Sequence, residues 1–478
     1  MALLGTPTFA ITPQPTQGAA LPGSYIASNQ FNFLTQYLPD TYEKEFERYG
    51  NRTVASFLRM VGAELPSNSD SIKWAEQGRL HIKYTSCTAG AATTGGFTLS
   101  IADTGVTGTN VAIRVGQTVL VQNNTSGVTN KGVVTAITTA TPPVATIACY
   151  DAVVIANTNV CTMFVYGSEF RKGTQSMTNT LDANDTFYSN NPIIIKETYT
   201  VNGSDMAQIG WVEVTTENGA TGYLWYLKSE HETRLRFEDY LETAMLEAIP
   251  ATNANAGSAS AAGLNGSEGV FHAVNSRGNV WGGAIPATLA EWDTIVARLD
   301  RQGAIEENAV FVNRDLSFAI DNMLATLNGY VAAGTASQSA SFGLFDNDVQ
   351  MALNLGFTGF RRGYDFYKSD WKYLNDPSLR GALNTTAATA AGTITGLLVP
   401  AGSTTVYDQI MGKNAKRPFL HVRYRASEAE DRRYKTWITG SAGGASTSDL
   451  DAMSVNFLSE RCVCVLGANN FVLFRYGA

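Results

Sequence analysis

The sequence predicts an α+β fold that carries a small inserted all-β domain. Three observations support this prediction. One long amphipathic segment precedes a region in which helix-like and strand-like patterns alternate, and the chain ends in strand-like segments. Residues 85–166 are dominated by Thr, Val, Ala and Gly and contain only four charged residues. The chain also contains 44 glycines, which favour turns and strands over helical bundles.

Residues 1–66 are expected to form an N-terminal arm followed by short helices. The first 29 residues are polar, contain Pro and Gly, and show no periodicity. Helical segments are predicted from Gln30 to Leu38 and from Asp40 to Tyr49, with a third beginning after Asn51, a favourable N-cap residue.

Residues 67–84 and 167–218 are expected to form the two sides of a long β-excursion. Residues 71–84 alternate in part, and strand character returns at 193–201 and 208–214 after a polar, loop-like stretch. Between these sides lies the insert, 85–166. Its strand-like runs are 97–101, 111–122, 132–137, 144–150 and 161–166, separated by turn-like residues. About five short strands in such a stretch predict a β-barrel or β-sandwich.

The clearest predicted element is a helix over residues 222–249. It ends before Pro250, which cannot continue a helix, and at 1.5 Å per residue it would span roughly 40 Å. One apolar stripe is predicted to face the core, and charged side chains cover the rest. The stripe consists of Leu224, Leu227, His231, Leu235, Leu241 and Met245.

A mixed α/β region follows the low-complexity loop 251–268. The patterns predict helices at 289–301 and 316–327 with a strand at 309–312 between them, and soft stretches at 331–343 and 382–405 interrupt this region. The closing strands are predicted at 419–425, 434–439, 459–466 and 471–476.

Composition excludes several functional classes. The net charge of −8 argues against a chain that wraps nucleic acid by neutralising its charge. Five cysteines are few for 478 residues and odd in number, so no disulfide framework is expected. The N-terminus lacks the basic flank of a signal peptide, and no run of roughly 18 apolar residues is present, so neither export nor membrane insertion is expected.

The sequence predicts no catalytic, metal or cofactor site. The four histidines, His81, His231, His272 and His421, are not at metal-binding spacing from one another or from a cysteine pair. Cys462 and Cys464 alternate in a strand pattern and are interpreted as core side chains. The acidic groups at 346–348 and 182–185 lack the full pattern of a calcium loop.

A locally basic segment is the remaining candidate site. It contains Lys413, Lys416, Arg417, Arg423, Arg425, Arg432, Arg433 and Lys435. These side chains could face DNA phosphates or a neighbouring subunit. Because Glu428, Glu430 and Asp431 are interleaved with them, a salt-bridged subunit interface is favoured.

The order of these parts resembles the major capsid proteins of tailed bacteriophages, which have the Hong Kong 97-type fold. Particular stretches are similar to the major capsid proteins of crAss-like phages of gut bacteria. These stretches are YEKEFERY at 42–49, FLRMVGAE at 57–64, WAEQGR at 74–79 and FVNRDLS at 311–317.

The resemblance implies an N-arm, an E-loop, a P-domain with a spine helix, and an A-domain. The E-loop would be the β-excursion carrying the insert. The P-domain would be 219–285 and 406–478, and the A-domain 286–405. The implied function is self-assembly, as hexamers and pentamers, into the icosahedral head shell of a virion made in the bacterial cytoplasm. Implied partners are portal and auxiliary or head-decoration proteins, and packaged double-stranded DNA held by weak non-specific contact, with no membrane.

Two alternatives remain open at this point. An encapsulin-like nanocompartment would share the fold but enclose a cargo, and the length and the insert argue against it. A secreted carbohydrate-binding adhesin would use the insert as its binding module. Against the adhesin stand the missing signal peptide and the few aromatic residues of the insert, namely Phe97, Tyr150, Phe164 and Tyr166.

Overall fold

The computed structural model contains both helices and strands, as the sequence predicts, and divides into two compact units. It describes residues 57–58, 63–178, 185–207, 214–215, 221–222, 225–303, 305–328, 358–383, 392–408, 413–444 and 446–477. Unit 1 comprises Met1–Met60, Ile194–Ala244 and Glu428–Glu460, and unit 2 comprises Val61–Ile193, Met245–Ser427 and Arg461–Ala478. The helices predicted between residues 30 and 49 lie outside the described residues.

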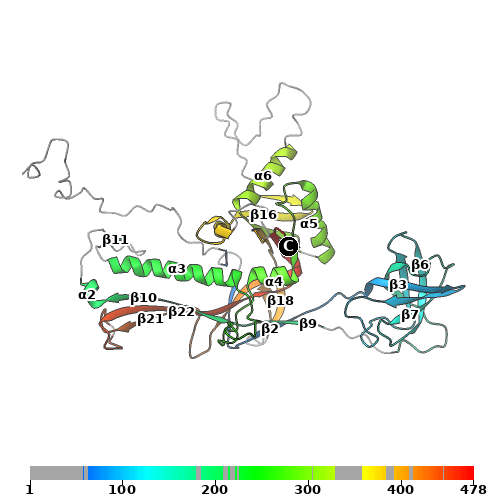
Figure 1. Ribbon diagram of the computed structural model, residues 1–478, viewed down its shortest axis with the longest axis horizontal. Helices are drawn as coiled ribbons and strands as arrows, with labels where there is room; N and C mark the ends of the chain where they lie inside the picture. Colours follow the sequence, from blue (N-terminus) through cyan, green and yellow to red (C-terminus); the bar gives the residue numbers. More distant parts are fainter. Residues whose placement is uncertain are drawn as a thin grey trace, which may run out of the picture. The chain divides into compact units, whose positions relative to one another are not determined.

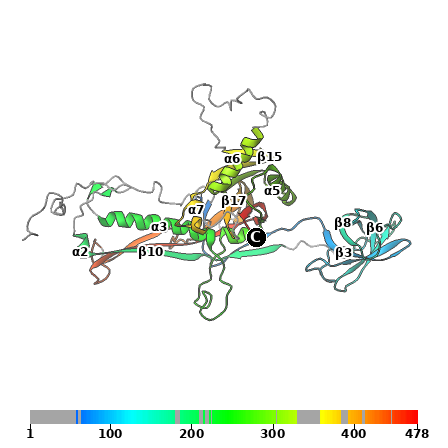
Figure 2. The ribbon, with the colours of Figure 1, turned by 45° about the horizontal axis from the view of Figure 1, so that its top comes forward.

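Unit 1 is built from one long helix and a ribbon of strands. The helix is α3 (Trp225–Glu247), and the strands are β10 (Ile193–Asn202), β21 (Lys435–Gly440) and the first part of β22 (Ala452–Val465). β21 is antiparallel to β22, and β10 lies on the other side of β22. Figures 1 and 2 both show α3 running along β10 and β22. The short elements α2 (Gly203–Met206), β11 (Val214–Thr215) and β12 (Thr221–Gly222) complete the described part of this unit.

The central sheet of unit 2 has six strands. Their order is β13 (Asn279–Trp281), β23 (Val472–Arg475), β17 (Ile394–Pro400), β14 (Glu307–Val312), β16 (Tyr364–Asp370) and β15 (Gly359–Arg362). The pairs β13–β23 and β14–β16 are parallel, and the other neighbours are antiparallel. Helices α5 (Leu289–Gln302) and α6 (Arg314–Asn328) pack their apolar faces on this sheet around the buried Trp292.

Helix α5 is delimited by its own end residues. Thr288 and Glu291 form a capping box: the Thr288 hydroxyl accepts from the Glu291 N–H, and the Glu291 carboxylate accepts from the Thr288 N–H. At the other end Gly303 adopts a left-handed conformation (φ 69°), which a glycine accepts without a steric penalty. These signals explain why the predicted range, 289–301, differs from the observed helix by one residue.

The prediction of a soft stretch at 382–405 was wrong for its second half, because β17 lies there. All seven residues of β17 are buried. A central strand that is covered on both faces shows no alternation of apolar and polar residues. The Ala, Thr and Gly residues around it also make the short apolar run hard to recognise. In this sheet β23, which lies in the expected P-domain, pairs with β17 of the expected A-domain.

Residues 83–168 close into a six-stranded barrel. Its strands are β3 (Lys83–Thr93), β4 (Gly96–Ile101), β5 (Gln117–Asn123), β6 (Thr129–Ile137), β7 (Val144–Cys149) and β8 (Val160–Ser168), in the order β3-β4-β7-β6-β5-β8. A continuous apolar core fills the barrel. The sequence analysis did not predict β3, whose residues are mostly small. It also predicted that β5 begins at residue 111, but residues 111–116 are not in a strand.

A pair of antiparallel strands flanks the barrel in sequence. β2 (Ile72–Glu76) pairs with β9 (Thr186–Asn190), and the first and last strands of the barrel, β3 and β8, also pair with each other. The two connections to the barrel therefore begin and end side by side. The sequence analysis expected 71–84 to lie opposite the returning strands at 193–201 and 208–214. The segment 193–201 is instead part of β10, which lies beside β22, whereas β9 falls in a stretch predicted as a loop.

The remaining elements of unit 2 surround this framework. β1 (Ala63–Ser67) is parallel to β20 (Leu420–Arg425), which is antiparallel to the second part of β22. β18 (Ser403–Asp408) and β19 (Lys413–Pro418) form a hairpin. Four short helices complete the unit: α4 (Val270–Arg277), α7 (Lys372–Asn375), η4 (Arg380–Leu383) and η5 (Ala468–Asn470).

Candidate functional site

The buried face of α3 differs from the predicted stripe. Leu241 and Met245 are buried, whereas Leu227, His231 and Leu235 are only half-buried, and Leu224 lies outside the described residues. The buried side chains recur every four residues, at Thr233, Phe237, Leu241 and Met245. At about 100° per residue, Leu235 lies about 200° around the helix from Phe237. The sequence merged two different apolar faces into one stripe, which is why Phe237 was missed.

Phe237 is the centre of an aromatic cluster in unit 1. Its ring stacks on Phe457 of β22, with centroids 5.7 Å apart, and meets Tyr434 edge to face at 5.5 Å. Val201 of β10 and Val455 of β22 belong to the same core. The cluster packs α3 against the strand ribbon. Aromatic pairs of this geometry stabilise a protein by about 0.5–1.5 kcal/mol each, in addition to the free energy gained by burying their surface.

The predicted polar face of α3 contains a buried carboxylate. Glu242 is 4% exposed, and its Oε1 accepts a hydrogen bond of 3.0 Å from the backbone N–H of Phe57, which is itself fully buried. A buried carboxylate is costly unless it is hydrogen-bonded. Glu242 therefore holds the backbone of the segment 57–58 against α3. The sequence analysis had instead predicted that the charged side chains of this helix face solvent.

Two of the predicted basic residues form ion pairs inside unit 1. Arg432 Nε lies 2.7 Å from Glu460 Oε2, and Lys435 Nζ lies 2.7 Å from Glu430 Oε1. The hydrogen bond from Lys435 lowers the pKa of Glu430. Because the Lys435–Glu430 pair is exposed, solvent screens it and it contributes little stability. Both cations are therefore neutralised, in part, by acids of their own chain.

The other described basic residues lie in different surroundings. In unit 2, Arg425 pairs with Asp70, and Arg417 of β19 is buried. Arg423 lies on β20 opposite Cys462, and the Arg433 N–H donates to Asp431 in unit 1. Lys413 and Lys416 belong to β19, but their side chains lie outside the described residues. Of the eight residues, five belong to unit 2 and three, Arg432, Arg433 and Lys435, to unit 1.

Cys462 and Cys464 lie on the buried face of β22, and Cys464 is opposite His421 of β20. The hydrogen bond between the two thiols, together with burial, raises the pKa of Cys462, and the same bond lowers the pKa of Cys464. His421 Nδ1 lies 3.2 Å from the carbonyl oxygen of Pro418. Within the described part of the chain no group of three or more potential ligands is placed to hold a metal ion.

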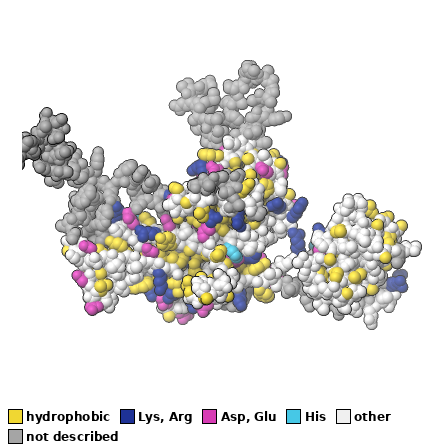
Figure 3. All heavy atoms as spheres, viewed as in Figure 1, with side chains coloured by type: hydrophobic (Ala, Val, Ile, Leu, Met, Phe, Trp, Pro, Cys, Tyr) yellow, Lys and Arg dark blue, Asp and Glu magenta, His cyan; other side chains and the backbone are white. Residues whose placement is uncertain are grey.

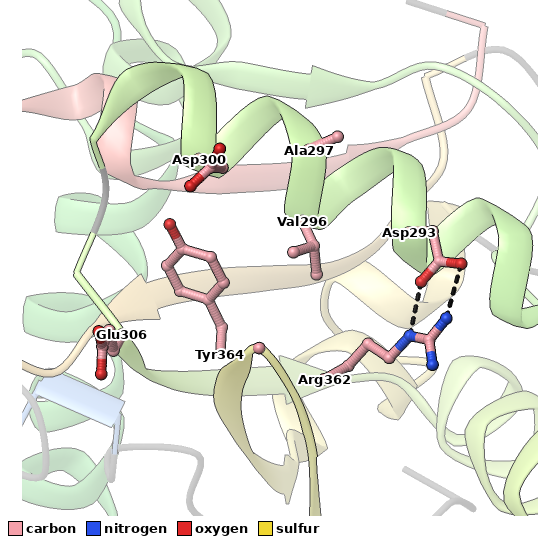
Figure 4. A pocket seen from close by; sticks show the side chains of 8 residues that line it. Asp293, Val296, Ala297, Asp300, Glu306, Arg362 and Tyr364 are labelled. Atoms are coloured by element: carbon pink, nitrogen blue, oxygen red, sulfur yellow. Dashed lines mark hydrogen bonds and ion pairs between the residues drawn. The ribbon is translucent and has the colours of Figure 1, made fainter.

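A cavity of about 610 Å³ lies between α5 and the turn that joins β15 to β16. Figure 4 shows Arg362 reaching Asp293 through two hydrogen bonds, of 2.7 and 2.9 Å, and Tyr364 directed toward Asp300. The Arg362 hydrogen bonds lower the pKa of Asp293, and burial, Asp300 and Glu306 raise the pKa of Tyr364.

Arg277 at the end of α4 is a contact residue that the sequence did not reveal. Its guanidinium lies 4.3 Å from the ring centroid of Tyr188 in β9 and 5.6 Å from that of Trp74 in β2. It also forms a 2.6 Å ion pair with Glu268, and both partners are largely buried. Arg277 thereby holds the two strands that flank the barrel against α4. The sequence analysis predicted no helix at 270–277, so the favourable place of this cation at a helix C-terminus was not foreseen.

Among the described residues, no helix has the length and hydropathy needed to cross a bilayer.

Comparisons with known proteins complete the description. No family model and no curated protein matches the sequence. The solved capsid of a native GTA particle matches with a TM-score of 0.40 and 8% identity, over 95% of this chain and 99% of that chain. A structure from Microbacterium phage Oxtober96 matches with a TM-score of 0.37 and 9% identity, over 93% and 97%. The cyanophage Pam1 capsid asymmetric unit matches with a TM-score of 0.36 and 13% identity, over 66% and 83%.

Proposed function

We propose that this chain is a major capsid protein of a tailed bacteriophage, a structural protein without enzymatic activity. Copies of it assemble, as hexamers and pentamers, into an icosahedral head shell around double-stranded DNA. In the finer form of the proposal the phage is crAss-like, and the subunit is made in the bacterial cytoplasm and resides in the virion. Portal and auxiliary or head-decoration proteins are its further partners.

The order of the elements along the chain carries this proposal. A two-stranded excursion, β2 and β9, flanks the barrel; the long helix α3 follows and packs on a strand ribbon; a mixed sheet with two helices comes next; and β20 to β23 close the chain. The sequence resemblance implies the same order of E-loop, spine helix, A-domain and closing strands. We accordingly assign the β2–β9 excursion to the E-loop and α3 to the spine helix.

The charge distribution suits a shell subunit. Only 16% of the residues are charged, so broad subunit contacts require the desolvation of few charges. Several cations, such as Arg432 and Lys435, already have acidic partners in their own chain. A net charge of −8 also keeps the subunit from binding tightly to DNA that must move during packaging. We infer that the eight basic residues at 413–435 serve subunit contacts more than DNA contacts.

The direct test is the assembly state of the full chain. Expressed and purified without partners, it should form particles that sediment as closed shells or as capsomers, and electron microscopy of the same sample should show them. A chain that remains a monomer over a wide concentration range, with and without a co-expressed portal protein, would refute the proposal. Shells that enclose a cellular protein cargo, but no nucleic acid when isolated from infected cells, would favour the nanocompartment alternative.

We further propose that the barrel serves contacts between subunits. Because β3 and β8 are neighbours, replacing residues 86–165 by a short Gly-Ser turn should leave the rest of the subunit folded. Circular dichroism and limited proteolysis would verify folding. The expected result is a shell that dissociates at a lower chaotrope concentration. A deletion shell of unchanged stability would contradict this role, and an unfolded product would show that the barrel belongs to the main core.

A further inference from the structure

The barrel exposes most of its aromatic side chains. Of the four aromatic residues between 85 and 166, Phe97 is buried, whereas Tyr150, Phe164 and Tyr166 are 49%, 41% and 49% exposed. Phe170, just beyond β8, is 43% exposed. Large apolar side chains are costly to leave in water, and contiguous groups of them usually mark binding surfaces. The few aromatic residues of the insert are therefore mostly at its surface.

Tyr150 and Tyr166 lie near the carboxylate of Glu169. The Tyr150 hydroxyl donates a hydrogen bond to Glu169 Oε2. Partial burial, Glu169 and the nearby Tyr166 raise the pKa of Tyr150 to about 12, so its hydroxyl stays protonated and continues to donate. Tyr166 occupies a bulge in β8, between the residues that pair with Thr118 and Val119 of β5. Bulges of this kind redirect a side chain and are frequent beside functional sites. We call Tyr150, Tyr166 and Glu169 the tyrosine face.

A buried hydroxyl lies on β5 opposite Gly167, the residue that follows Tyr166. Thr118 is next to the inward-facing Val119 on β5, so its side chain points outward, yet it is only 5% exposed. Among the described residues its Oγ1 has no hydrogen-bond partner. Gly167, opposite Thr118 in β8, has no side chain to supply one. A buried polar group normally finds a partner, so this hydroxyl indicates a buried water beside the tyrosine face.

The barrel that carries the tyrosine face is rich in hydroxyl groups and carries few charges. The segment 85–166 contains four charged residues, of which Lys131 is next to Tyr150 through a backbone hydrogen bond. Figure 3 shows few charged side chains on the visible surface of the barrel. The charged residues nearest to it along the chain and across the strands are Lys131, Asp151, Glu169, Arg171 and Lys172, three cations and two anions, so neither a polyanion nor a polycation would be strongly attracted. The barrel is also closed, which leaves no free strand edge to which a peptide could add.

We propose that the tyrosine face binds a neutral glycan. The C–H groups of a sugar ring carry partial positive charge and stack on the electron-rich face of an aromatic ring, here Tyr150 or Tyr166. Sugar hydroxyls donate to the Glu169 carboxylate, which fixes the orientation of the ring. Such a site is independent of shell formation and adds a recognition role to the barrel.

The test is a binding titration of the full chain, in whichever assembly state it adopts. The probes are maltohexaose, cellohexaose, laminarihexaose and a linear mannohexaose, measured by saturation-transfer NMR and calorimetry. At least one should bind, and Tyr150→Ala and Tyr166→Ala should each weaken that binding by about tenfold or more, as expected for a central aromatic contact. The matched control is Tyr367→Ala, which removes a tyrosine that is 57% exposed on β16 of the central sheet and should change nothing.

Two further measurements make each result decisive. All three tyrosines are exposed, so the variants should melt like the parent, and an unchanged melting temperature excludes unfolding as the cause of lost binding. If no hexasaccharide binds at millimolar concentration, or if binding survives both changes in the tyrosine face, the proposal is refuted. It is equally refuted if these two variants lose subunit assembly in sedimentation while sugar binding persists, because the face is then a protein interface.

Discussion

Replacing Phe237 by alanine tests the packing of α3 on its strand ribbon. Phe237 is fully buried and contacts both Tyr434 and Phe457. Truncating such a phenylalanine removes its transfer free energy and leaves a cavity, which together cost about 3–5 kcal/mol. For a unit of this size each kcal/mol lowers the melting temperature by roughly 2–4 °C, so the transition of unit 1 should fall by on the order of 10 °C.

The assay is differential scanning calorimetry of the full chain, supported by urea titration followed by tryptophan fluorescence. Tyr240→Ala is the matched control, because Tyr240 lies on the same helix but is 44% exposed. It should change the free energy of unfolding by less than about 0.5 kcal/mol. Phe237→Leu should fall between the two, since most of the buried volume is kept. If Phe237→Ala and Tyr240→Ala give equal shifts, the assigned orientation of α3 is refuted.

Three other perturbations follow from the same description. Leu241→Asp should prevent the formation of a soluble subunit, because it buries a charge. Leu235→Asp should be tolerated better, because Leu235 is only half-buried. Equal yields of soluble protein from the two variants would contradict the assignment of Leu241 and Leu235 to different faces of α3. Thr288→Ala should lower the free energy of unfolding by about 1 kcal/mol through loss of the capping box, measured by urea denaturation, and Thr288→Ser should restore most of it. Burial raises the pKa of Cys87 to about 12, so little of its reactive thiolate is present at pH 8. Maleimide should therefore label the half-buried Cys149 before Cys87. Comparable labelling rates of the two cysteines, measured by timed mass spectrometry, would contradict this placement.

The sequence predicted best the elements with strong local signals. Helix α5 carries a capping box and a C-terminal glycine, and the run 307–312 is a short apolar strand with clear boundaries, so both appear close to where they were expected. By contrast, β17 is apolar on both faces and lies in a low-complexity context, so no periodicity could distinguish it. Strand pairing was also beyond reach, because the partner of β2 is set by tertiary contacts such as the Arg277 stack rather than by local pattern.

The candidate site was less predictable for a physical reason. Whether Leu235 or Phe237 faces the core depends on which side of α3 the ribbon covers, and both choices fit a helical period. The exposure of Tyr150 and Tyr166 depends on the inward or outward register of the barrel strands and on a bulge, neither of which composition encodes. Arg277 and the buried Glu242 draw their roles from residues distant in sequence.

The adjacent ends of the barrel have a consequence for the order of folding. β2 and β9 are separated by more than a hundred residues, and closing an open chain of that length would cost roughly 4 kcal/mol of conformational entropy. Once the barrel has folded, β3 and β8 are already neighbours, and only residues 77–82 and 169–185 remain to be closed. The entropic cost then falls by about 1–2 kcal/mol. The kinetically favoured order is therefore that the barrel folds first and β2 pairs with β9 second. A newly made subunit would then contain a folded barrel before its β2–β9 sheet has formed.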